Sequence, residues 1–255
     1  MPDTNPPAQP GKDTIQRPPA PKPPDLRERG GGGATSERRL FMQLLVFTDC
    51  PYTSDLIDAA KAEGLDAVVY ESLHDPRGAA LLVWHEDPAD FAGKLRAMLR
   101  GDALQDITLD PGMTMLGRTY SIGYEPDLDE ALFKRPIRHA TNPDWPWAVW
   151  YPLRRSGDFA KLPRDEQMSI LKEHGTIGFG FGAGDFAHDI RLASHGLDIH
   201  DNDFTIGLVG KELAPLSKLV ETMRKTKQTS TYIEKLGPFF VGKAVWWSED
   251  GTVIG

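Results

Sequence analysis

The sequence predicts an α+β protein made of two ferredoxin-like βαββαβ halves. Apolar, β-prone stretches alternate with stretches of helical period, and turn residues separate them. The order strand, helix, strand, strand, helix, strand occurs once before residue 125 and again after residue 146. Helices would cover one face of each sheet, so we expect the two bare sheet faces to pack together within the chain.

The first half starts with FMQLLVFTD, which predicts a strand. TSDLIDAAKAEG predicts a helix that Thr53 caps and Gly64 ends. DAVVYESL and AALLVWHE predict two strands joined by the turn HDPRG. DPADFAGKLRAMLRG predicts a helix because Asp87 can cap it and Pro88 suits its first turn. MTMLGRTYSIGY predicts the closing strand.

The second half repeats this order. WAVWYPL predicts a strand, LPRDEQMSILKEHG a helix, and DFAHDIRLAS and NDFTIGLVG two strands. LAPLSKLVETMRKT predicts the second helix and PFFVGKAVWW the last strand. The run GFGFGAG follows a helix and precedes a strand, which reverses the order of a dinucleotide-binding fingerprint. We therefore expect Gly178, Gly180, Gly182 and Gly184 to end the helix and turn the chain.

These patterns divide the chain into four parts. Residues 1–38 contain nine of the 21 prolines and predict a disordered tail. Residues 39–124 form the first half, 125–146 a polar linker that includes RPIRHATNPDWP, and 147–248 the second half.

Composition narrows the possible functions. A net charge of -8 makes nucleic acid an improbable partner, because an acidic chain gains nothing from counterion release. No apolar run is long enough to span a membrane. A single cysteine, Cys50, precludes a disulfide within the chain. We expect a cytoplasmic protein.

Histidines supply two candidate metal sites. His174 lies in the last turn of its predicted helix, where it could interact with the negative end of that helix or present a neutral imidazole to a haem iron. From the residues alone both interpretations stay open. A zinc site at His188, His195 and His200 is a weaker hypothesis, because the spacing matches no zinc motif.

The segment WPWAVWYPLRR is the best candidate for redox chemistry. Trp147, Tyr151 and Leu153 have the same parity, so on one strand they share a face. Tyr151 offers a redox-active phenol next to Arg154 and Arg155, whose guanidinium groups could hold carboxylates. The alternative is that these aromatic residues only form the core of a sheet.

Over about residues 40–247 the sequence resembles the chlorite dismutase family, which includes the coproheme decarboxylases. The resemblance rests on WYPLRR, MSILKEHGTIG, SHGLD followed by DF, LVETMRKTKQTSTY and GPFFVG. It implies a dimeric α+β barrel, a homopentamer, and an iron porphyrin, haem b or coproheme, in the C-terminal half. In that family a helical histidine is the proximal iron ligand, which maps onto His174.

The resemblance also suggests roles for other residues. Tyr151-Pro152-Leu153 resembles the decarboxylase element that supplies a hydrogen-transferring tyrosine, and Arg155, with Arg154, would contact propionates. The distal position falls on Asp189, with Arg191 on the same side of the strand, and the position that pairs with the proximal histidine falls on Gln228. Trp147 and Leu153 would line the porphyrin.

The implied activity is decarboxylation of coproheme to haem with hydrogen peroxide. A peroxidase or chlorite dismutase in which Asp189 or Arg191 works on the distal side is the second hypothesis. A non-catalytic haem carrier or sensor is the third.

Overall fold

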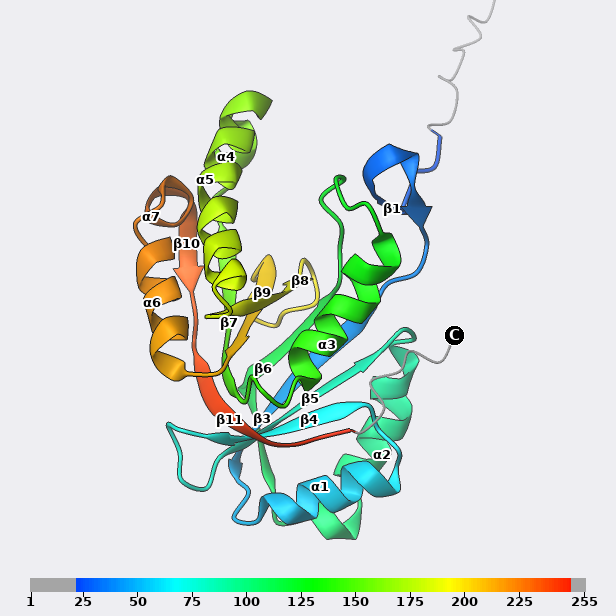
Figure 1. The fold of residues 1–255 in the computed structure, drawn as a ribbon. Coiled ribbons are helices and arrows are strands. Elements are labelled where there is room, and N and C mark those ends of the chain that lie inside the picture. The colour runs from blue at the N-terminus through cyan, green and yellow to red at the C-terminus, as the bar shows by residue number, and fades with distance from the viewer. Residues whose placement is uncertain (1–21, 249–255) are drawn as a thin grey trace, which may run out of the picture.

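The computed structural model describes residues 22–248 and confirms the α+β class with the element order predicted for both halves (Figure 1). The first half consists of β3 (Phe41–Asp49), α1 (Thr53–Ala62), β4 (Ala67–Ser72), β5 (Ala79–His85), η2 (Phe91–Leu95) continuing as α2 (Arg96–Leu99), η3 (Asp102–Leu104) and β6 (Thr108–Arg118). The second half consists of β7 (Trp147–Arg155), α4 (Gly157–Lys161), α5 (Arg164–Ala183), β8 (His188–Ala193), β9 (Phe204–Gly210), α6 (Leu213–Met223), α7 (Lys227–Tyr232), β10 (Ile233–Leu236) and β11 (Phe240–Trp247).

The strands of both halves join into one antiparallel sheet that closes on itself. Its order is β10-β7-β11-β4-β5-β3-β6-β8-β9, and β7 pairs with β9 as well, from Trp147 opposite Gly210 to Leu153 opposite Phe204. This second pairing turns the open sheet into a ring of strands. The seam between β6 and β8 is short, with Arg118 opposite Ala193 as its one residue pair.

Alternation along the strands assigns each side chain to the inside or the outside of the ring. Met42 and Leu44 on β3, and Ala148 and Trp150 on β7, point into the main core that both halves share. The next residues along point outward, where helices cover them. The outer cluster of the first half packs under α1 and α2, and that of the second half, which includes Tyr151, packs under α5 and α6.

The helix α5 is longer than predicted. It continues through Gly175, Gly178, Gly180 and Gly182 and ends at Ala183, so His174 lies near its middle and not in its last turn. Each glycine weakens a helix by about 1 kcal/mol relative to alanine. Packing of Ile170, Ile177 and Phe181 along one side offsets this weakness.

The segment 125–146 is not only a polar connection. It contains η4 (Glu130–Lys134), which continues as α3 (Arg135–Thr141). Leu132, Phe133 and Ile137 are buried in the main core. RPIRHATNPDWP is mostly polar and therefore predicts a linker, but the buried residues of this segment recur at helical spacing and form one apolar side.

The described part of the N-terminal tail also differs from its prediction. The strands β1 (Glu28–Arg29) and β2 (Thr35–Ser36) pair on either side of η1 (Gly31–Gly33). The Glu28 carboxylate accepts hydrogen bonds from Arg118 (Oε1 to Nη1, 2.9 Å) and from the backbone N–H of Ser121 (3.0 Å). One acidic side chain thus fastens the segment to the loop after β6. The rest of the predicted tail, 1–21, lies outside the described residues.

Candidate functional site

The imidazole of His174 is half-buried on the side of α5 that faces the sheet. Burial, followed by the positive charges of Arg155 and Arg191, lowers the pKa of His174. The imidazole is therefore neutral at pH 7, which is the form that binds metals. Its Nδ1 atom is buried and has no hydrogen-bond partner among residues 22–248. A neutral ring with an unpartnered nitrogen fits an iron porphyrin better than it fits a closed core.

Arg155, at the end of β7, has an unpartnered donor near this imidazole. Its guanidinium lies 4.5 Å from the ring centroid of Phe159 and 5.1 Å from that of Phe204. The Nε atom is buried and has no acceptor within the described chain. Burial lowers the pKa of Arg155, but an arginine stays charged at neutral pH. A buried guanidinium with an unpartnered N–H is suited to bind a carboxylate.

Asp189 and Arg191 lie together on β8, as their equal parity predicted. The Arg191 Nε donates to Asp189 Oδ2 over 2.9 Å, and both side chains are partly exposed. The inward neighbours Ile190 and Leu192 belong to the main core, so Asp189 and Arg191 point outward. Charges on both residues influence the pKa of His174, which indicates that they face the same space.

Tyr151 lies on the outer face of β7 and is 8% exposed. Its ring stacks on Phe239 with centroids 4.7 Å apart. Burial, and to a smaller extent the negative charge of Asp189, raises the pKa of the Tyr151 phenol far above its ordinary value. The phenol therefore keeps its proton at any physiological pH and can give up a hydrogen atom only as a neutral O–H group.

Gln228 is 6% exposed and its Oε1 atom also has no partner within the described chain. Its helix α7 touches α5 next to His174, because the backbone N–H of Lys227 donates to Glu173 Oε2 (3.1 Å). Two unpartnered polar atoms, His174 Nδ1 and Gln228 Oε1, therefore lie on neighbouring helices. An Nδ1–H donating to an amide oxygen would satisfy both.

Three further residues were predicted for the site; Leu153 lies near it, and Trp147 and Arg154 do not. Leu153 packs in the outer cluster close to Arg155. Trp147 lies four residues, roughly 13 Å, along β7 from Tyr151, and its ring faces the Lys243 amine at 5.6 Å. Arg154 points to the other side of β7 and pairs with Asp201 (2.7 Å) and Glu234 (3.8 Å). The structure does not bring Trp147 or Arg154 to His174.

One side of the site is formed by a loop that no sequence pattern indicates. The sequence predicts residues 119–124 as part of a strand, but β6 ends at Arg118 and a loop follows. Tyr120 packs on Phe204 (5.7 Å between ring centroids). Burial raises the pKa of the Tyr120 phenol, and the positive charges of Arg191 and Arg155 oppose this shift. Farther along the loop, the Tyr124 hydroxyl reaches the sulfur of Met168 on α5 (3.9 Å). No sequence motif marks these residues.

His139, on α3, is a buried histidine next to this site. Its Nδ1 lies 2.8 Å from the backbone carbonyl oxygen of Asp189, which identifies it as a donor. Burial is the largest cause that lowers the pKa of His139 to about 4; its contacts with Asp189 oppose this shift, and His188 and Arg135 add to it. His139 is therefore neutral in the folded protein at pH 7.

This pKa predicts a loss of stability in weak acid. Between about pH 6.5 and 4 the unfolded chain binds a proton at His139 and the folded chain does not, so the free energy of unfolding falls as the pH falls. A shift of this size is worth up to roughly 3 kcal/mol. Urea unfolding at a series of pH values should show this component in the wild type and lack it in His139→Phe. His195→Gln, at an exposed position, should keep it. An unchanged slope in His139→Phe would contradict the assignment.

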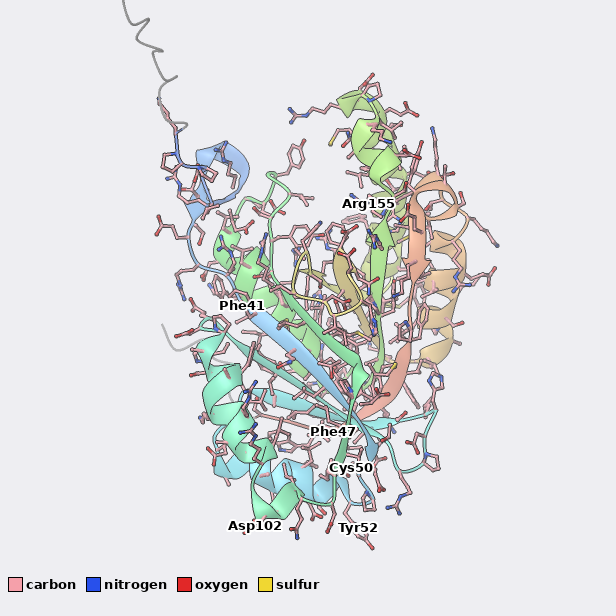
Figure 2. All side chains as sticks on the ribbon, turned by 180° about the vertical axis from the view of Figure 1, so that it is seen from behind. Phe41, Phe47, Cys50, Tyr52, Asp102 and Arg155 are labelled. Carbon is pink, nitrogen blue, oxygen red and sulfur yellow. The ribbon has the colours of Figure 1, made fainter. Side chains whose placement is uncertain are left out.

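The alternative sites receive no support. Among residues 22–248 no three histidine, cysteine, aspartate or glutamate side chains are grouped to hold a metal ion, so the weaker hypothesis of a zinc site at His188, His195 and His200 gains no support. Cys50 is buried at the end of the molecule opposite to Arg155 (Figure 2). Burial, aided by Asp55 and Asp49, raises the pKa of Cys50 to about 11, which makes the thiol a poor nucleophile.

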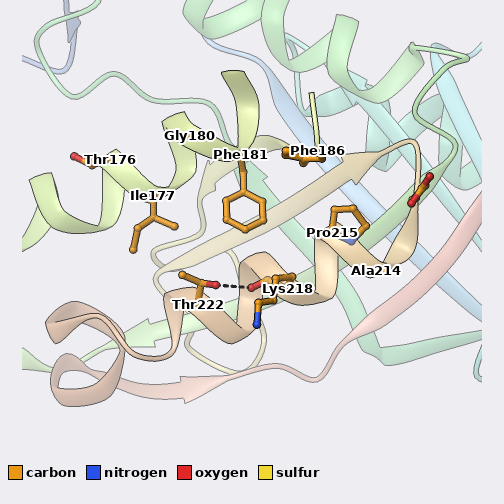
Figure 3. A pocket seen from close by; sticks show the side chains of 10 residues that line it. Thr176, Ile177, Gly180, Phe181, Phe186, Ala214, Pro215, Lys218 and Thr222 are labelled. Atoms are coloured by element: carbon orange, nitrogen blue, oxygen red, sulfur yellow. Dashed lines mark hydrogen bonds between the residues drawn. The ribbon is translucent and has the colours of Figure 1, made fainter. Parts of the chain in front are cut away.

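A groove of about 910 Å³ lies between α5 and α6 (Figure 3). Ile177, Phe181 and Pro215 make its surface mostly apolar, and His174 is not part of its lining. We place the candidate site at His174 and not in this groove, because the unpartnered donors and the converging charges are at His174.

Among residues 22–248 no helix is long and apolar enough to cross a membrane.

Comparisons with known proteins agree with the fold. The family model described as chlorite dismutase matches residues 53–245, well over half of the chain. A heme-binding protein from Thermus thermophilus is similar, with a TM-score of 0.64 and 17% identity over 81% of this chain and 91% of its own. A mutant chlorite dismutase from Candidatus Nitrospira defluvii gives a TM-score of 0.61 and 16% identity over 82% and 92% of the two chains. That dismutase in complex with imidazole gives 0.59 and 17% over the same shares. No curated protein matches the sequence.

Proposed function

Because the chain belongs to the chlorite dismutase family, we propose that it binds an iron porphyrin through His174 and decarboxylates coproheme to haem b with hydrogen peroxide. The observation that carries the proposal is the half-buried His174 imidazole, whose Nδ1 atom has no partner among residues 22–248 and which lies near Arg155, Arg191 and Asp189. The heme-binding description of the similar Thermus thermophilus protein supports the choice of cofactor.

The residues of the site fit a porphyrin that carries carboxylates. His174 would bind the iron through one ring nitrogen, and Gln228, on the neighbouring helix, would orient the ring if its unpartnered Oε1 accepted a hydrogen bond from Nδ1–H. Arg155 would bind a propionate through its unpartnered Nε, and Arg191 could bind another. The bound porphyrin would supply one-electron oxidising equivalents from peroxide.

Tyr151 would act as the hydrogen-transferring group. In each decarboxylation a propionate loses carbon dioxide and the equivalent of a hydride, and peroxide takes up the two electrons and forms water. An oxidised Tyr151 oxygen would take a hydrogen atom, with one electron, from the propionate carbon next to the ring. The second electron would pass to the peroxide-derived oxidant as the bond to the carboxylate breaks, carbon dioxide leaves and a vinyl group remains. Stacking on Phe239 holds the phenol in one orientation, and burial keeps bulk water away from it.

The Asp189–Arg191 pair favours a second candidate, a peroxidase or a chlorite-type enzyme. A carboxylate beside a guanidinium can move a proton and stabilise a bound anion on the distal side. Oxygen release from chlorite, or peroxide-dependent bleaching of a dye, would distinguish this activity from decarboxylation.

A spectroscopic titration tests the proposal. Purified protein is titrated with coproheme and with haem b, and then hydrogen peroxide is added to the coproheme complex. We expect a saturable Soret shift with both porphyrins and conversion of coproheme to haem b. The conversion is measured by chromatography of the extracted pigment. Binding without conversion of coproheme, chlorite or dye would favour a haem carrier. The homopentamer and the cytoplasmic location stay predictions.

A further inference from the structure

Trp145, Asp185 and His188 form a cluster beside the candidate site that the proposed function does not use. The Trp145 ring stacks on the His188 ring, with centroids 3.5 Å apart and planes inclined by 14°. The Trp145 indole N–H donates to Asp185 Oδ1 over 3.1 Å, and His188 Nε2 lies 2.9 Å from the same oxygen. One carboxylate thus holds both rings of the stack.

This environment favours loss of an electron from the indole. Oxidation of an indole leaves a positive charge on the ring, which a carboxylate hydrogen-bonded to its N–H stabilises. Lys211, the largest cause, and His188 keep the pKa of Asp185 at about 2, so the carboxylate stays ionised at neutral pH. The indole therefore keeps its proton when it loses an electron.

Trp147 and Trp246 face a lysine amine directly, whereas at Trp145 the Lys211 amine pairs with the other carboxylate oxygen of Asp185, Oδ2 (2.5 Å). The Trp147 ring faces the Lys243 amine at 5.6 Å, and the Trp246 ring faces the Lys61 amine at 5.9 Å. A nearby positive charge stabilises the electron-rich ring and resists its oxidation. Within residues 22–248, Trp145 is the tryptophan whose indole N–H is bonded to a carboxylate.

His139 connects the cluster with the candidate site. Its ring centroid lies 5.5 Å from that of Trp145 and 5.4 Å from that of His188. Its Nδ1–H donates to the backbone oxygen of Asp189, whose side chain pairs with Arg191. Contacts thus run without a break from the strand that carries Asp189 to the half-buried Trp145.

We propose that Trp145 is an electron relay through which the protein oxidises small one-electron donors at its surface, away from the porphyrin. The inference rests on the proposed function for its oxidant, an iron porphyrin oxidised by hydrogen peroxide. One electron leaves the Trp145 ring for that oxidant, and the indole proton stays in its hydrogen bond to Asp185. A donor at the surface then returns one electron to the ring, so one peroxide oxidises two donor molecules.

The first test needs no porphyrin. The apo-protein is oxidised with photochemically generated tris(bipyridine)ruthenium(III), and the tryptophan radical is followed by transient absorption and EPR. We expect the spectrum of a radical cation, with a yield about tenfold lower in Asp185→Asn, the order of effect of one charge-assisted hydrogen bond, and at least as low in Trp145→Phe, which removes the indole itself. Trp246→Phe is the matched control and should keep the yield. Equal yields in Trp145→Phe and in the wild type would overturn the proposal.

The second test uses the haem-loaded protein with peroxide and ferrocyanide. Donor oxidation should fall about tenfold in Trp145→Phe, as in the first test, while the porphyrin spectrum stays that of the wild type. If Trp145→Phe binds porphyrin normally and oxidises the donor at the wild-type rate, the relay is wrong and the proposed function is untouched. If the wild-type chain binds no iron porphyrin, the proposed function is wrong and the relay loses its oxidant.

Discussion

Replacement of His174 by alanine is expected to remove the spectrum of a histidine-ligated iron porphyrin and to weaken porphyrin binding by more than about a hundredfold. Loss of a residue that merely orients a metal ligand already weakens binding by roughly 10–100-fold, and His174 would be the ligand itself. Alanine favours helices, so α5 should stay folded in the variant. A haem titration followed by absorption, with circular dichroism for folding, measures both effects.

Added imidazole provides a sharper form of the same experiment. It should enter the space left by the His174 side chain and restore the ligated spectrum, which a purely structural role of His174 would not allow. His195→Ala is the matched control because that imidazole is exposed, 3.7 Å from Asp203. If His174→Ala titrates like the wild type, with the same Soret maximum and affinity, the iron ligand is another residue.

Tyr151→Phe is expected to slow peroxide-dependent conversion of coproheme by a hundredfold or more, because a positioned hydrogen-transferring group contributes about 10²–10⁴ to the rate. Phenylalanine keeps the stack on Phe239 and the buried apolar contacts, so coproheme affinity should change little. Conversion is measured by chromatography of the porphyrins after single additions of peroxide. The intermediate in which only one propionate has been decarboxylated should also no longer be detected.

Tyr70→Phe is a suitable control for a buried tyrosine. Tyr70 is 1% exposed in the main core, and burial raises the pKa of its phenol too. Removal of its hydroxyl should leave the conversion rate unchanged. A Tyr151→Phe protein that converts coproheme as fast as the wild type would exclude the hydrogen-transfer role, while porphyrin binding could still be correct.

The fold was predictable because short stretches of sequence show the alternation of apolar and polar residues that is typical of strands and the spacing of apolar residues that is typical of helices. The parity of Trp147, Tyr151 and Leu153 placed them on one face of β7, and the structure confirms this. The same argument grouped Asp189 with Arg191, which form an ion pair on β8. Resemblance to the family added the α+β barrel, which periodicity alone does not specify.

The errors share a physical cause, since contacts between distant segments overruled local preference. Glycine disfavours helices, yet α5 passes through four glycines because its other side chains pack on the sheet. Residues 130–141 look polar, yet Leu132 and Ile137 are buried in the main core. The hairpin at Glu28 depends on Arg118 and Ser121, some 90 residues away, and no local pattern reports such a bond.

Only part of the candidate site has a local signature in the sequence, for the same reason. His174, Tyr151 and Arg155 stand in recognisable motifs. By contrast, the wall formed by Tyr120 and Phe204 requires knowing which loop follows β6. The contact between Trp145 and His188 joins residues 43 positions apart, and the sequence carries no sign of it.

Closure of the sheet through β7 and β9 also restricts how copies of this chain can associate. Except along the short seam between β6 and β8, the strands of the ring pair on both sides, so they offer little unpaired backbone to which an incoming chain could add a strand. Outside the ring, β10 is only four residues long. Away from that seam, copies of the chain can associate only through side chains on the outer surface, where substitutions can change specificity without disturbing the barrel.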